Sequence, residues 1–552
     1  MKRKILHIHP QDNLIVALRD LEAGETAQLE QTAYTVCERI PGKHKFAAAD
    51  LAPGDLLRMY GVPVGRATRP IPAGARITQE NTEHYAEPID PQRLPAAPAW
   101  APPDVSRFAG RSFMGYRRRD GRTGTQNLWL VIPLVFCENR NLQVMRSHLE
   151  ETLGFGRPKA YSLDLQQLIA MRRAGASAEE LLEADILREG ASAQPERVFP
   201  HVDGIRFLTH EGGCGGTRQD SAALCRLLAA YLAHPNVAGG TILSLGCQHA
   251  QQELLREALD ALDPGFDKPL YWLEQQRSRS ERQLIADAVK MTFAGLAQAN
   301  EWRRAPAPLS GISLGLKCGG SDGFSGITAN PALGYAADLL AVLGGQTLLA
   351  EFPELHGVEA GLAARCVHPE DARRFLDLMD RYGRQALAAG SGFHANPSPG
   401  NIRDGLITDA MKSAGAARKG GTSPITGVLD YTEQAQRPGL HLLCTPGNDV
   451  EATTGMAGSG ANVIVFTTGL GTPTGNAVAP TLKVSTNSDL ARRMADLIDF
   501  DAGGMISGEA TLAETGEALL ELVIRTAGGD FTPAAVRLGQ DDFIPWKRGV
   551  SL

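Results

Sequence analysis

Hydrophobic residues in the first ninety positions fall into short runs that turn residues separate. The runs are ILHIH, NLIVAL, AQLEQTAYTV and DLLRMYGVPVG, and Gly-Glu, Pro-Gly and Pro-Ala-Gly turn sequences punctuate them. Short apolar runs bounded by such residues are typical of strands. The pattern therefore predicts a small, mostly β domain over residues 1–88.

A proline-rich segment, EPIDPQRLPAAPAWAPPDVS, follows at residues 87–106. Proline lacks an amide hydrogen and fixes its own φ, so it breaks helices and favours an extended chain. We therefore expect a linker over residues 89–108.

Beyond the linker, apolar runs alternate with segments of helical spacing. The runs that end in Gly-rich polar residues are VDGIRFLTH, GGTILSLGC, GISLGLKC, QTLLAEFPE, LHLLCTPGND and NVIVFTTGLG. The segments of helical spacing are AALCRLLAAYLAH, ERQLIADAVKMTFAGLAQA and DARRFLDLMDRYGRQALAA. This succession is the pattern of an α/β protein. We expect two α/β domains, over residues 109–305 and 306–552, with the boundary in NEWRRAPAPLS.

In α/β proteins, ligands bind where the carboxyl ends of strands meet. The stretch KCGGSDGFSGITANPALG at residues 317–334 follows such a predicted strand and contains five glycines. So many glycines give up conformational entropy for backbone freedom, which indicates a chain folded tightly around a ligand. Cys318, Asp322 and Asn330 are its candidate functional residues.

Three cysteines, Cys214, Cys247 and Cys318, lie in glycine-flanked turns after predicted strands. Metal ligation and burial as a small apolar side chain are both open for them. None belongs to a CxxC pair, which argues against a structural zinc site. The eight cysteines show no disulfide framework, so we expect a reducing compartment, the cytoplasm.

Other polar residues at predicted strand ends could carry acid–base chemistry. His210 directly follows a predicted strand and is a candidate acid, base or ligand, with a hydrogen-bonded core histidine as the alternative. Glu351 and Glu354 follow the apolar run QTLLA and offer carboxylate bases or oxygen ligands. The turns NPSPGN and TTGLGTPTG could bind a carboxylate through backbone amides, and Lys412, Lys419 and Lys483 flank them.

Composition and charge narrow the class of protein further. The chain has 552 residues, of which 43% are hydrophobic and 21% charged, as in globular proteins. The net charge of −7 argues against a nucleic-acid partner, and no long apolar run predicts a membrane helix. Neither a P-loop nor a dinucleotide fingerprint is present. A small-molecule enzyme of this size is commonly a homo-oligomer, which we expect here.

Many longer motifs together resemble the altronate/galactarate dehydratase family over nearly the whole chain. They are IHPQDN, HKFA, FMGYRRRDGRTGTQN, the GCG and LGC turns, CGGSDGFSGITANPALG, EFPELHG, NPSPGN, TPGND, FTTGLGTPTG and IDFDAG. The closing DDFIPWKRGVSL leans toward the altronate branch. The resemblance implies an N-terminal SAF-type (β-clip) domain and an α/β body with Rossmann-like parallel sheets. It also implies a lyase that dehydrates a sugar acid to a 2-keto-3-deoxy acid with a divalent metal, Fe²⁺ or Mn²⁺.

The resemblance also assigns roles to residues. The implied catalytic residues are His210, Glu351, Glu354 and Lys412. The implied metal ligands are Cys214, Cys247, Cys318 and Asp322. The implied substrate-binding residues are His9, His44, Asn330, Ser398, Asn401, Asp449, Thr468, Gly471 and Lys483. As an alternative, the three cysteines could hold a [4Fe–4S] cluster that leaves one iron open to a hydroxy acid.

Several positions depart from the family pattern. Uncharged residues replace the family's charged ones at Gln126, Gln248, Ile402, Ala410 and Leu470. Two further departures are Gly212 for a tyrosine and Asp404 for a glycine. Loss of an arginine removes a bidentate clamp for a carboxylate or hydroxyl, so we expect a changed substrate that is smaller, less hydroxylated or has only one carboxylate. The alternatives are a galactarate dehydratase, another β-eliminating carbon–oxygen or carbon–sulfur lyase such as a sulfolactate-type sulfite lyase, and a catalytically silent binding homologue.

Overall fold

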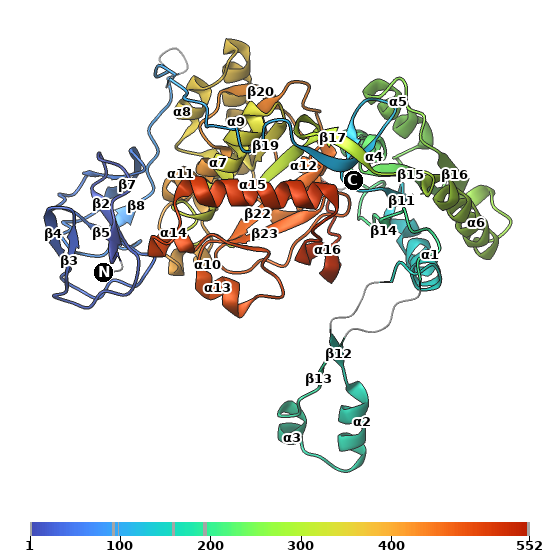
Figure 1. Cartoon of the computed structure of the whole chain (residues 1–552), viewed down its shortest axis with the longest axis horizontal. Helices are drawn as coiled ribbons and strands as arrows, with labels where there is room; N and C mark the ends of the chain where they lie inside the picture. The colour runs from blue at the N-terminus through green and yellow to red at the C-terminus, as the bar shows by residue number, and fades with distance from the viewer. Residues whose placement is uncertain (1–2, 91–93, 98, 157–160, 191–195, 549–552) are drawn as a thin grey trace.

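A computed structural model describes residues 3–90, 94–97, 99–156, 161–190 and 196–548 (Figure 1). An N-terminal β domain lies at one end of the long axis, beside a large α/β domain, and a smaller α/β domain follows on the other side (Figure 1). Among the described residues, no helix is both long enough and apolar enough to cross a membrane.

The N-terminal domain is built from short antiparallel strands, which confirms the predicted β domain. Its first sheet has the order β1(Ile5–Leu6), β2(Leu14–Ala17) and β5(Lys45–Ala47). A hairpin joins β3(Thr26–Leu29) to β4(Thr32–Thr35). The third sheet has the order β6(Leu56–Met59), β7(Val62–Ala67) and β8(Thr82–Glu83).

The smaller α/β domain contains a four-stranded parallel sheet. Its order is β14(Gly204–Phe207), β11(Leu128–Pro133), β15(Val237–Ser244) and β16(Leu270–Glu274). Its helices are α1(Asn139–Thr152), α4(Arg218–Ala233), α5(Gln252–Leu262) and α6(Glu281–Ala299), with the 3₁₀ turns η1(Phe136–Glu138) and η2(Gln275–Arg277). A small sheet of β10(Thr123–Gly124), β9(Ser112–Arg117) and β17(Ala305–Pro308) lies at its junction with the large domain.

An excursion from the smaller domain stands away from the rest of the molecule (Figure 1). It consists of α2(Leu165–Arg173) and α3(Ala178–Leu182) between the paired strands β12(Tyr161–Leu163) and β13(Leu187–Glu189). Every residue of both strands is exposed. No apolar alternation marks these strands, and for that reason the hydrophobic pattern did not predict them.

The large domain contains a seven-stranded parallel sheet. Its order is β20(Ile425–Leu429), β21(Gly439–Leu443), β19(Gln346–Ala350), β18(Ser313–Cys318), β22(Val463–Thr468), β23(Thr481–Ser485) and β24(Phe500–Asp501). Its helices are α7(Ala329–Val342), α8(Glu359–Ala364), α9(Pro369–Ala388), α10(Pro399–Arg403), α11(Asp409–Ala417), α12(Asp449–Gly458), α13(Ser488–Arg493), α14(Gly504–Ser507), α15(Leu512–Gly528) and α16(Ala534–Leu538). Its 3₁₀ turns are η3(Leu309–Gly311), η4(Phe352–Leu355), η5(Phe393–Ala395) and η6(Arg418–Gly420).

Burial on both faces explains why these strands read as continuous apolar runs. Every residue of β18 and of β22 is buried, as parallel sheets covered by helices on both faces require. Figure 1 shows α15 lying across this sheet, and α15 also packs along α7. The predicted α/β architecture is therefore confirmed.

The two α/β domains share a hydrophobic core. Leu128 and Leu130 of β11 belong to the same buried cluster as Leu348 of β19 and Ile464 of β22. Burial of apolar surface across this junction is the main free-energy term that joins the two domains.

The seven-stranded sheet has a topological switch point beside β18. From β18 the chain passes to β19 on one side, and it later returns to β22 on the other side. Loops that leave neighbouring strands in opposite directions open a crevice at the carboxyl ends of those strands. This crevice is where the sheet geometry favours a ligand site.

The N-terminal domain inserts one loop between two loops of the large domain. A Cβ added to Gly323 or to Gly405 would lie 2.1 Å or 2.4 Å from the Lys43 carbonyl oxygen. Lys45 Nζ donates to the Gly405 carbonyl oxygen at 2.7 Å, and burial lowers the pKa of Lys45 to about 7. Glycines at both positions therefore allow the close approach of the Lys43 loop.

Candidate active site

Two strand ends bring charged residues to the switch-point crevice. β18 ends in Lys317 and Cys318, and Glu351 directly follows β19. Because β18 and β19 are parallel neighbours, these residues meet at one edge of the sheet. Glu351 has a left-handed backbone, with φ 70° and ψ 74°. Such a conformation in a non-glycine residue costs energy and is concentrated at functional sites.

Lys317 is fully buried and pairs with two carboxylates. Its Nζ lies 2.8 Å from Glu351 Oε1 and 2.7 Å from Asp449 Oδ1, at the start of α12. Burial would lower the pKa of Lys317, but the carboxylates of Glu351 and Asp449 raise it. The Lys317 ammonium therefore stays charged inside the protein.

Glu354, on η4, is the centre of a second group. Its Oε1 lies 2.9 Å from Lys412 Nζ, and its Oε2 lies 3.4 Å from Lys419 Nζ. Cys318 Sγ donates to Glu354 Oε2 at 3.2 Å, and Lys419 Nζ lies 3.1 Å from the same sulfur. Lys412 Nζ also donates to Asn396 Oδ1 at 2.6 Å. The two groups together form the lysine–glutamate cluster: Lys317, Cys318, Glu351, Glu354, Lys412, Lys419 and Asp449.

The two glutamates of the lysine–glutamate cluster differ in their protonation equilibria. Burial and the neighbouring Glu354 charge raise the pKa of Glu351 to about 8, against the effect of Lys317. Burial also disfavours ionised Glu354, but Lys412 and Lys419 hold its pKa well below the usual value. Burial raises the pKa of Cys318 to about 11. Carboxyl pairs whose pKa values are pushed apart can divide the work of proton transfer.

The cluster also contains a candidate metal site. Within the described part of the chain, only Cys318, Glu351 and Glu354 offer three ligand atoms within 4.8 Å of one another. Glu351 Oε2 is buried and has no hydrogen-bond partner. A thiolate and two carboxylates suit a divalent transition metal, and metal binding itself deprotonates a thiol. The donor set therefore fits an ion such as Fe²⁺ or Mn²⁺.

Several predicted substrate-binding residues hold the loops around the cluster. Asn330 accepts from Thr467 Oγ1 at 2.6 Å and donates to the Gly415 carbonyl oxygen at 3.0 Å. Ser398 and Asn401 form the capping box of α10. Asn401 Nδ2 also donates to the Ser321 carbonyl oxygen at 2.8 Å, which fixes the glycine-rich loop after β18.

Three further predicted residues lie near the end of β22: Thr468 is its last residue, Gly471 lies in the following turn, and Lys483 lies in β23. Thr468 Oγ1 accepts the Gly471 amide at 3.0 Å, and Gly471 has a φ of 91°. Lys483 lies with Nζ 3.9 Å from the centre of the Phe466 ring and donates to the Thr474 carbonyl oxygen. Burial lowers the pKa of Lys483 to about 7.

Asp322, which we expected to bind metal, is already saturated with protein partners. Its buried carboxylate accepts from Ser325 Oγ at 3.1 Å and from Thr486 Oγ1 at 3.0 Å. It also lies 3.1 Å from Lys43 Nζ of the N-terminal domain. In this structure Asp322 anchors the inserted loop and is not part of the Cys318 ligand group.

The predicted histidines lie outside the lysine–glutamate cluster. His9 Nδ1 accepts from the Gln11 amide at 3.2 Å, and His44 Nε2 lies 3.0 Å from the Arg403 carbonyl oxygen. His210 Nδ1 accepts from the Gly212 amide at 3.0 Å, and Nε2 donates to the Pro133 carbonyl oxygen at 2.8 Å. Burial lowers the pKa of His210 to about 4. Both ring nitrogens of His210 are therefore engaged, which does not suit the acid–base role expected for it.

The predicted ligand cysteines are on two different sheets. Cys318 is buried at the end of β18, whereas Cys214 and Cys247 are exposed and follow β14 and β15 of the four-stranded sheet. The only single-ion group among the described residues that contains Cys318 contains neither of the others. The structure therefore does not bring Cys214, Cys247, Cys318 and Asp322 together around one ion.

Lys317 is the member of the lysine–glutamate cluster that sequence reasoning missed. The signal was present, because Lys317 is the one charged residue of the apolar strand SLGLKC. Lysine is almost never fully buried unless it is paired. A lysine in a strand buried on both faces thus predicts carboxylate partners nearby.

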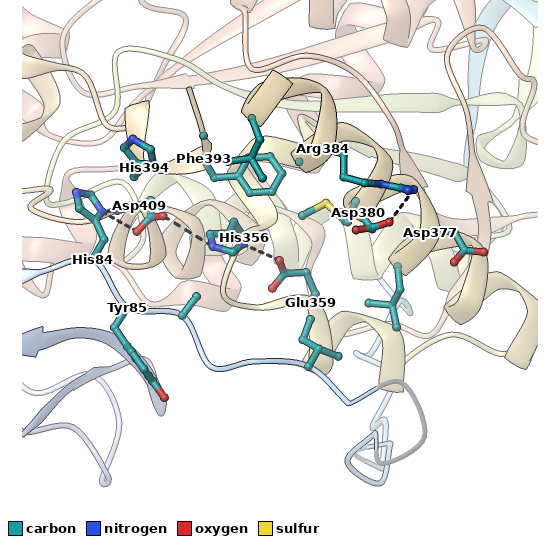
Figure 2. Close-up of a pocket in the computed structure, with 17 residues that line it drawn as sticks. His84, Tyr85, His356, Glu359, Asp377, Asp380, Arg384, Phe393, His394 and Asp409 are labelled. Carbon is teal, nitrogen blue, oxygen red and sulfur yellow. Dashed lines mark hydrogen bonds and ion pairs between the residues drawn. The ribbon is translucent and has the colours of Figure 1, made fainter. Parts of the chain in front are cut away.

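A separate cavity of about 750 Å³ is lined by His84, His356, Glu359 and Asp409 and by no residue of the lysine–glutamate cluster (Figure 2). Asp409 lies one turn before Lys412 on α11, and His84 Nδ1 lies 2.8 Å from Asp409 Oδ1. The hydrogen bond to Asp409 raises the pKa of His84. His356 Nδ1 lies 2.9 Å from Glu359 Oε1, and Figure 2 shows both imidazoles on the same wall as Asp409.

Three family models match the chain, in order. The altronate/galactarate dehydratase SAF domain matches residues 3–85. The second domain of D-galactarate dehydratase/altronate hydrolase matches residues 115–300. The C-terminal domain of D-galactarate/altronate dehydratase matches residues 309–551.

Curated relatives match at similar identity over nearly their whole length. The chain is 32% identical to altronate dehydratase of Escherichia coli K12 over 534 residues, 96% of each chain. It is 33% identical to altronate dehydratase of Bacillus subtilis 168 over 505 residues, 91% of this chain and 90% of the relative. It is 31% identical to the L-threo-forming galactarate dehydratase of E. coli K12 over 530 residues, 95% and 92% of the two chains.

A buried acid–base cluster at the switch point of a parallel sheet is the arrangement of an α/β enzyme. The matches define the kind of enzyme. The chain belongs to the altronate/galactarate dehydratase family and is a hydro-lyase of that family.

Proposed function

We propose that the lysine–glutamate cluster dehydrates a hydroxylated carboxylic acid of the altronate type to its 2-keto-3-deoxy acid. The observation that carries this proposal is the buried pair of glutamates with opposite pKa shifts, held by three lysines at a strand-end crevice. Similarity to altronate and galactarate dehydratases supports the substrate class.

The reaction requires a base, an acid and positive charge. The base takes the Cα hydrogen as a proton, and the C–H electron pair becomes the Cα–Cβ double bond. The Cβ–O bond breaks, and the acid delivers a proton so that the hydroxyl leaves as water. The resulting enol takes a proton at Cβ and becomes the 2-keto acid. The Cα proton is acidic enough to remove only if positive charge stabilises the developing enediolate.

Glu351 is suited to be the base. Lys317 holds its Oε1, whereas Oε2 is buried and has no hydrogen-bond partner. A base with a pKa near the operating pH is the most effective, and the raised pKa of Glu351 meets that condition. We therefore assign removal of the Cα proton to Glu351 Oε2.

Lys412 is suited to protonate the leaving hydroxyl. Its ammonium has three hydrogens, and Glu354 Oε1 and Asn396 Oδ1 account for two of them. The third remains for a substrate oxygen. Lys317 and Lys419, both fully buried, provide the positive charge for the developing enediolate.

Of the three residues that could hold a metal, Cys318 and Glu354 would hold the divalent ion that the family resemblance implies, which leaves Glu351 Oε2 for proton removal. When bound, such an ion supplies Lewis acidity to the oxygens of the substrate. The proton transfers assigned to Glu351 and Lys412 use these side chains and do not pass through the metal.

Leu470 supports a substrate smaller or less hydroxylated than altronate. A Cβ added to Gly320, two residues after Cys318, would lie 3.4 Å from Leu470 Cβ, so the leucine packs against the turn beside the cluster. An apolar side chain there provides no bidentate partner for a carboxylate or a pair of hydroxyls.

A substrate screen tests this proposal. Anaerobic protein with Fe²⁺ or Mn²⁺ is incubated with altronate, galactarate and shorter hydroxy acids, and 2-keto acid is measured. We expect 2-keto acid from at least one monocarboxylic hydroxy acid, at a higher rate than from galactarate. Sulfite released from sulfolactate, without dehydration of any acid, would show a sulfite lyase instead. Binding without turnover of any acid would show a silent homologue.

A further inference from the structure

Three exposed cysteines follow neighbouring strands of the four-stranded sheet. Cys137 follows β11, Cys214 follows β14 and Cys247 follows β15, and all three are free and exposed. In the sheet, β11 lies between β14 and β15, and both pairings are parallel. The carboxyl ends of the three strands therefore meet at one edge.

Backbone hydrogen bonds join the loops that contain these cysteines. The Phe136 amide donates to the Gly212 carbonyl oxygen at 3.1 Å. The His249 amide donates to the Gly213 carbonyl oxygen at 2.9 Å. Each of these four residues lies within two positions of one of the cysteines. The loops are thus joined within two residues of the cysteines.

Gly213 shows how closely two of the loops pack. A Cβ at this position would lie 2.0 Å from the Leu134 carbonyl oxygen, and Gly213 has a φ of 94°. Only glycine permits both the backbone conformation and the contact. The loop that contains Cys214 therefore rests directly on the loop that contains Cys137.

Three exposed thiols at one edge of the four-stranded sheet are unusual for free cysteines. Free cysteine is among the most buried residue types, and Cys225, Cys318 and Cys444 follow that rule here. Exposed thiols are open to oxidation. Three of them gathered from three loops are therefore better explained as ligands than as packing residues.

We propose that Cys137, Cys214 and Cys247 bind an iron–sulfur cluster of the [4Fe–4S] type. Cysteine thiolates are the usual ligands of such clusters. The three sulfurs do not form a group with all ligand atoms within 4.8 Å, the spacing that suits one ion. A cluster of several irons separates its thiolates more widely, so it fits these loops better than a single zinc or iron ion. This site is separate from the lysine–glutamate cluster and does not depend on its proposed function.

The surroundings of the three cysteines suit such a cluster. Gln276, after the fourth strand β16, donates from Nε2 to Cys247 Sγ at 3.1 Å, and hydrogen bonds to the sulfurs tune iron–sulfur clusters. A cavity of about 700 Å³ lies beside Cys214, lined also by Asn139, Glu451 and Trp546. Three thiolates leave one iron without a protein thiolate, and this cavity has room for an oxygen ligand on that iron.

Anaerobic reconstitution of the full chain with Fe²⁺ and sulfide tests the proposal. We expect about four acid-labile sulfide per chain in the wild type, with about four iron in addition to the ion that the Cys318 site would hold. The C137S, C214S and C247S variants should each lose most of both. C318S tests the alternative ligand set and should keep the full acid-labile sulfide content, and C37S, the matched control in the N-terminal domain, should keep both sulfide and iron. Iron without sulfide in the wild type, or an equal content in C137S, would overturn the proposal.

Thiol alkylation of the unmutated protein gives a second readout that no folding defect can obscure. After reconstitution, Cys137, Cys214 and Cys247 should be protected from iodoacetamide, whereas the exposed Cys37 should react as before. Equal labelling of all four cysteines with and without iron and sulfide would contradict the proposed ligands.

Discussion

Glu351 is held by its backbone as well as by its ion pair. Its left-handed conformation follows directly after β19, and its amide donates to Thr445 Oγ1 at 3.0 Å. Strain of this kind persists only where the surroundings over-determine the conformation. The result is a carboxylate with one oxygen fixed on Lys317 and the other left without a partner.

Leu470 is the residue at which substrate choice can be changed. We expect L470R to raise kcat/KM for altronate by about tenfold, because an arginine adds a charge-assisted clamp worth about 1.5 kcal/mol. Initial rates of 2-keto acid formation measure this. The matched control is L538R, since Leu538 is exposed at the end of α16. A fall in kcat/KM for altronate in L470R would contradict a role for this position in selecting the substrate.

Three buried histidines, one beside α4 and two elsewhere in the fold, are neutral in the folded protein. His234 directly follows α4. Its Nδ1 accepts from the Asn236 amide at 3.1 Å, and its Nε2 donates to the Ala461 carbonyl oxygen at 3.0 Å. Burial lowers the pKa of His234 to about 3, and it lowers the pKa values of His210 and His441 to about 4.

These histidines predict a loss of stability in acid. Below about pH 6.5 the unfolded chain takes up protons that the folded chain cannot accept, so the free energy of unfolding falls as the pH falls. Each histidine contributes a slope of about 1.4 kcal/mol per pH unit until its folded pKa is reached. Urea unfolding between pH 7.5 and 5 measures the slope. We expect H234Q to reduce it by that amount and H148Q, at an exposed position of α1, to leave it unchanged; an unaltered slope in H234Q would refute the assignment.

At the scale of elements, the hydrophobic pattern predicted the strands that are buried on both faces and missed those that are exposed. Strands β18 and β22 were predictable because both faces are covered and every residue is buried. The paired strands β12 and β13 were not, because all their residues are exposed and have no apolar period to detect. Secondary structure without a buried face leaves no hydrophobic signal in a single sequence.

The candidate site was predictable only in part. Cys318, Glu351 and Glu354 could be grouped because each follows a predicted strand. The same reasoning grouped Cys214 and Cys247 with Cys318, because a strand end in the sequence does not tell which sheet it belongs to. Here the cysteines divide between the four-stranded and the seven-stranded sheets. Pairing of strands is a long-range property, and no local pattern specifies it.

At the scale of the whole molecule, the Lys43 loop joins the N-terminal domain to the loops around the active site. Lys43 pairs with Asp322 at 3.1 Å and with Asp404 at 2.9 Å. Asp322 lies in the glycine-rich loop that starts at the end of β18. Docking of the β domain therefore helps to fix the loop that follows β18, next to the lysine–glutamate cluster.

Substitution of Gly323 tests this docking. A Cβ there meets the Lys43 carbonyl oxygen at 2.1 Å, so we expect G323A to displace the inserted loop and to destabilise the protein by about 1–3 kcal/mol. Hydrogen exchange at β5, which begins two residues after Lys43, should accelerate. G361A is the control, because a Cβ at Gly361 meets no atom within 4 Å. Equal exchange at β5 in G323A and the wild type would show that the docking is not as described.

The most direct test of proton removal by Glu351 is the rate of 2-keto acid formation by E351Q, on the acid that the substrate screen identifies. The amide keeps the size of the side chain but cannot take a proton, so we predict a fall in kcat of about 10²- to 10⁴-fold. E433Q, at a surface ion pair with Arg374, should keep the wild-type rate. A kcat of E351Q within threefold of the wild type would contradict the central claim that Glu351 is the base.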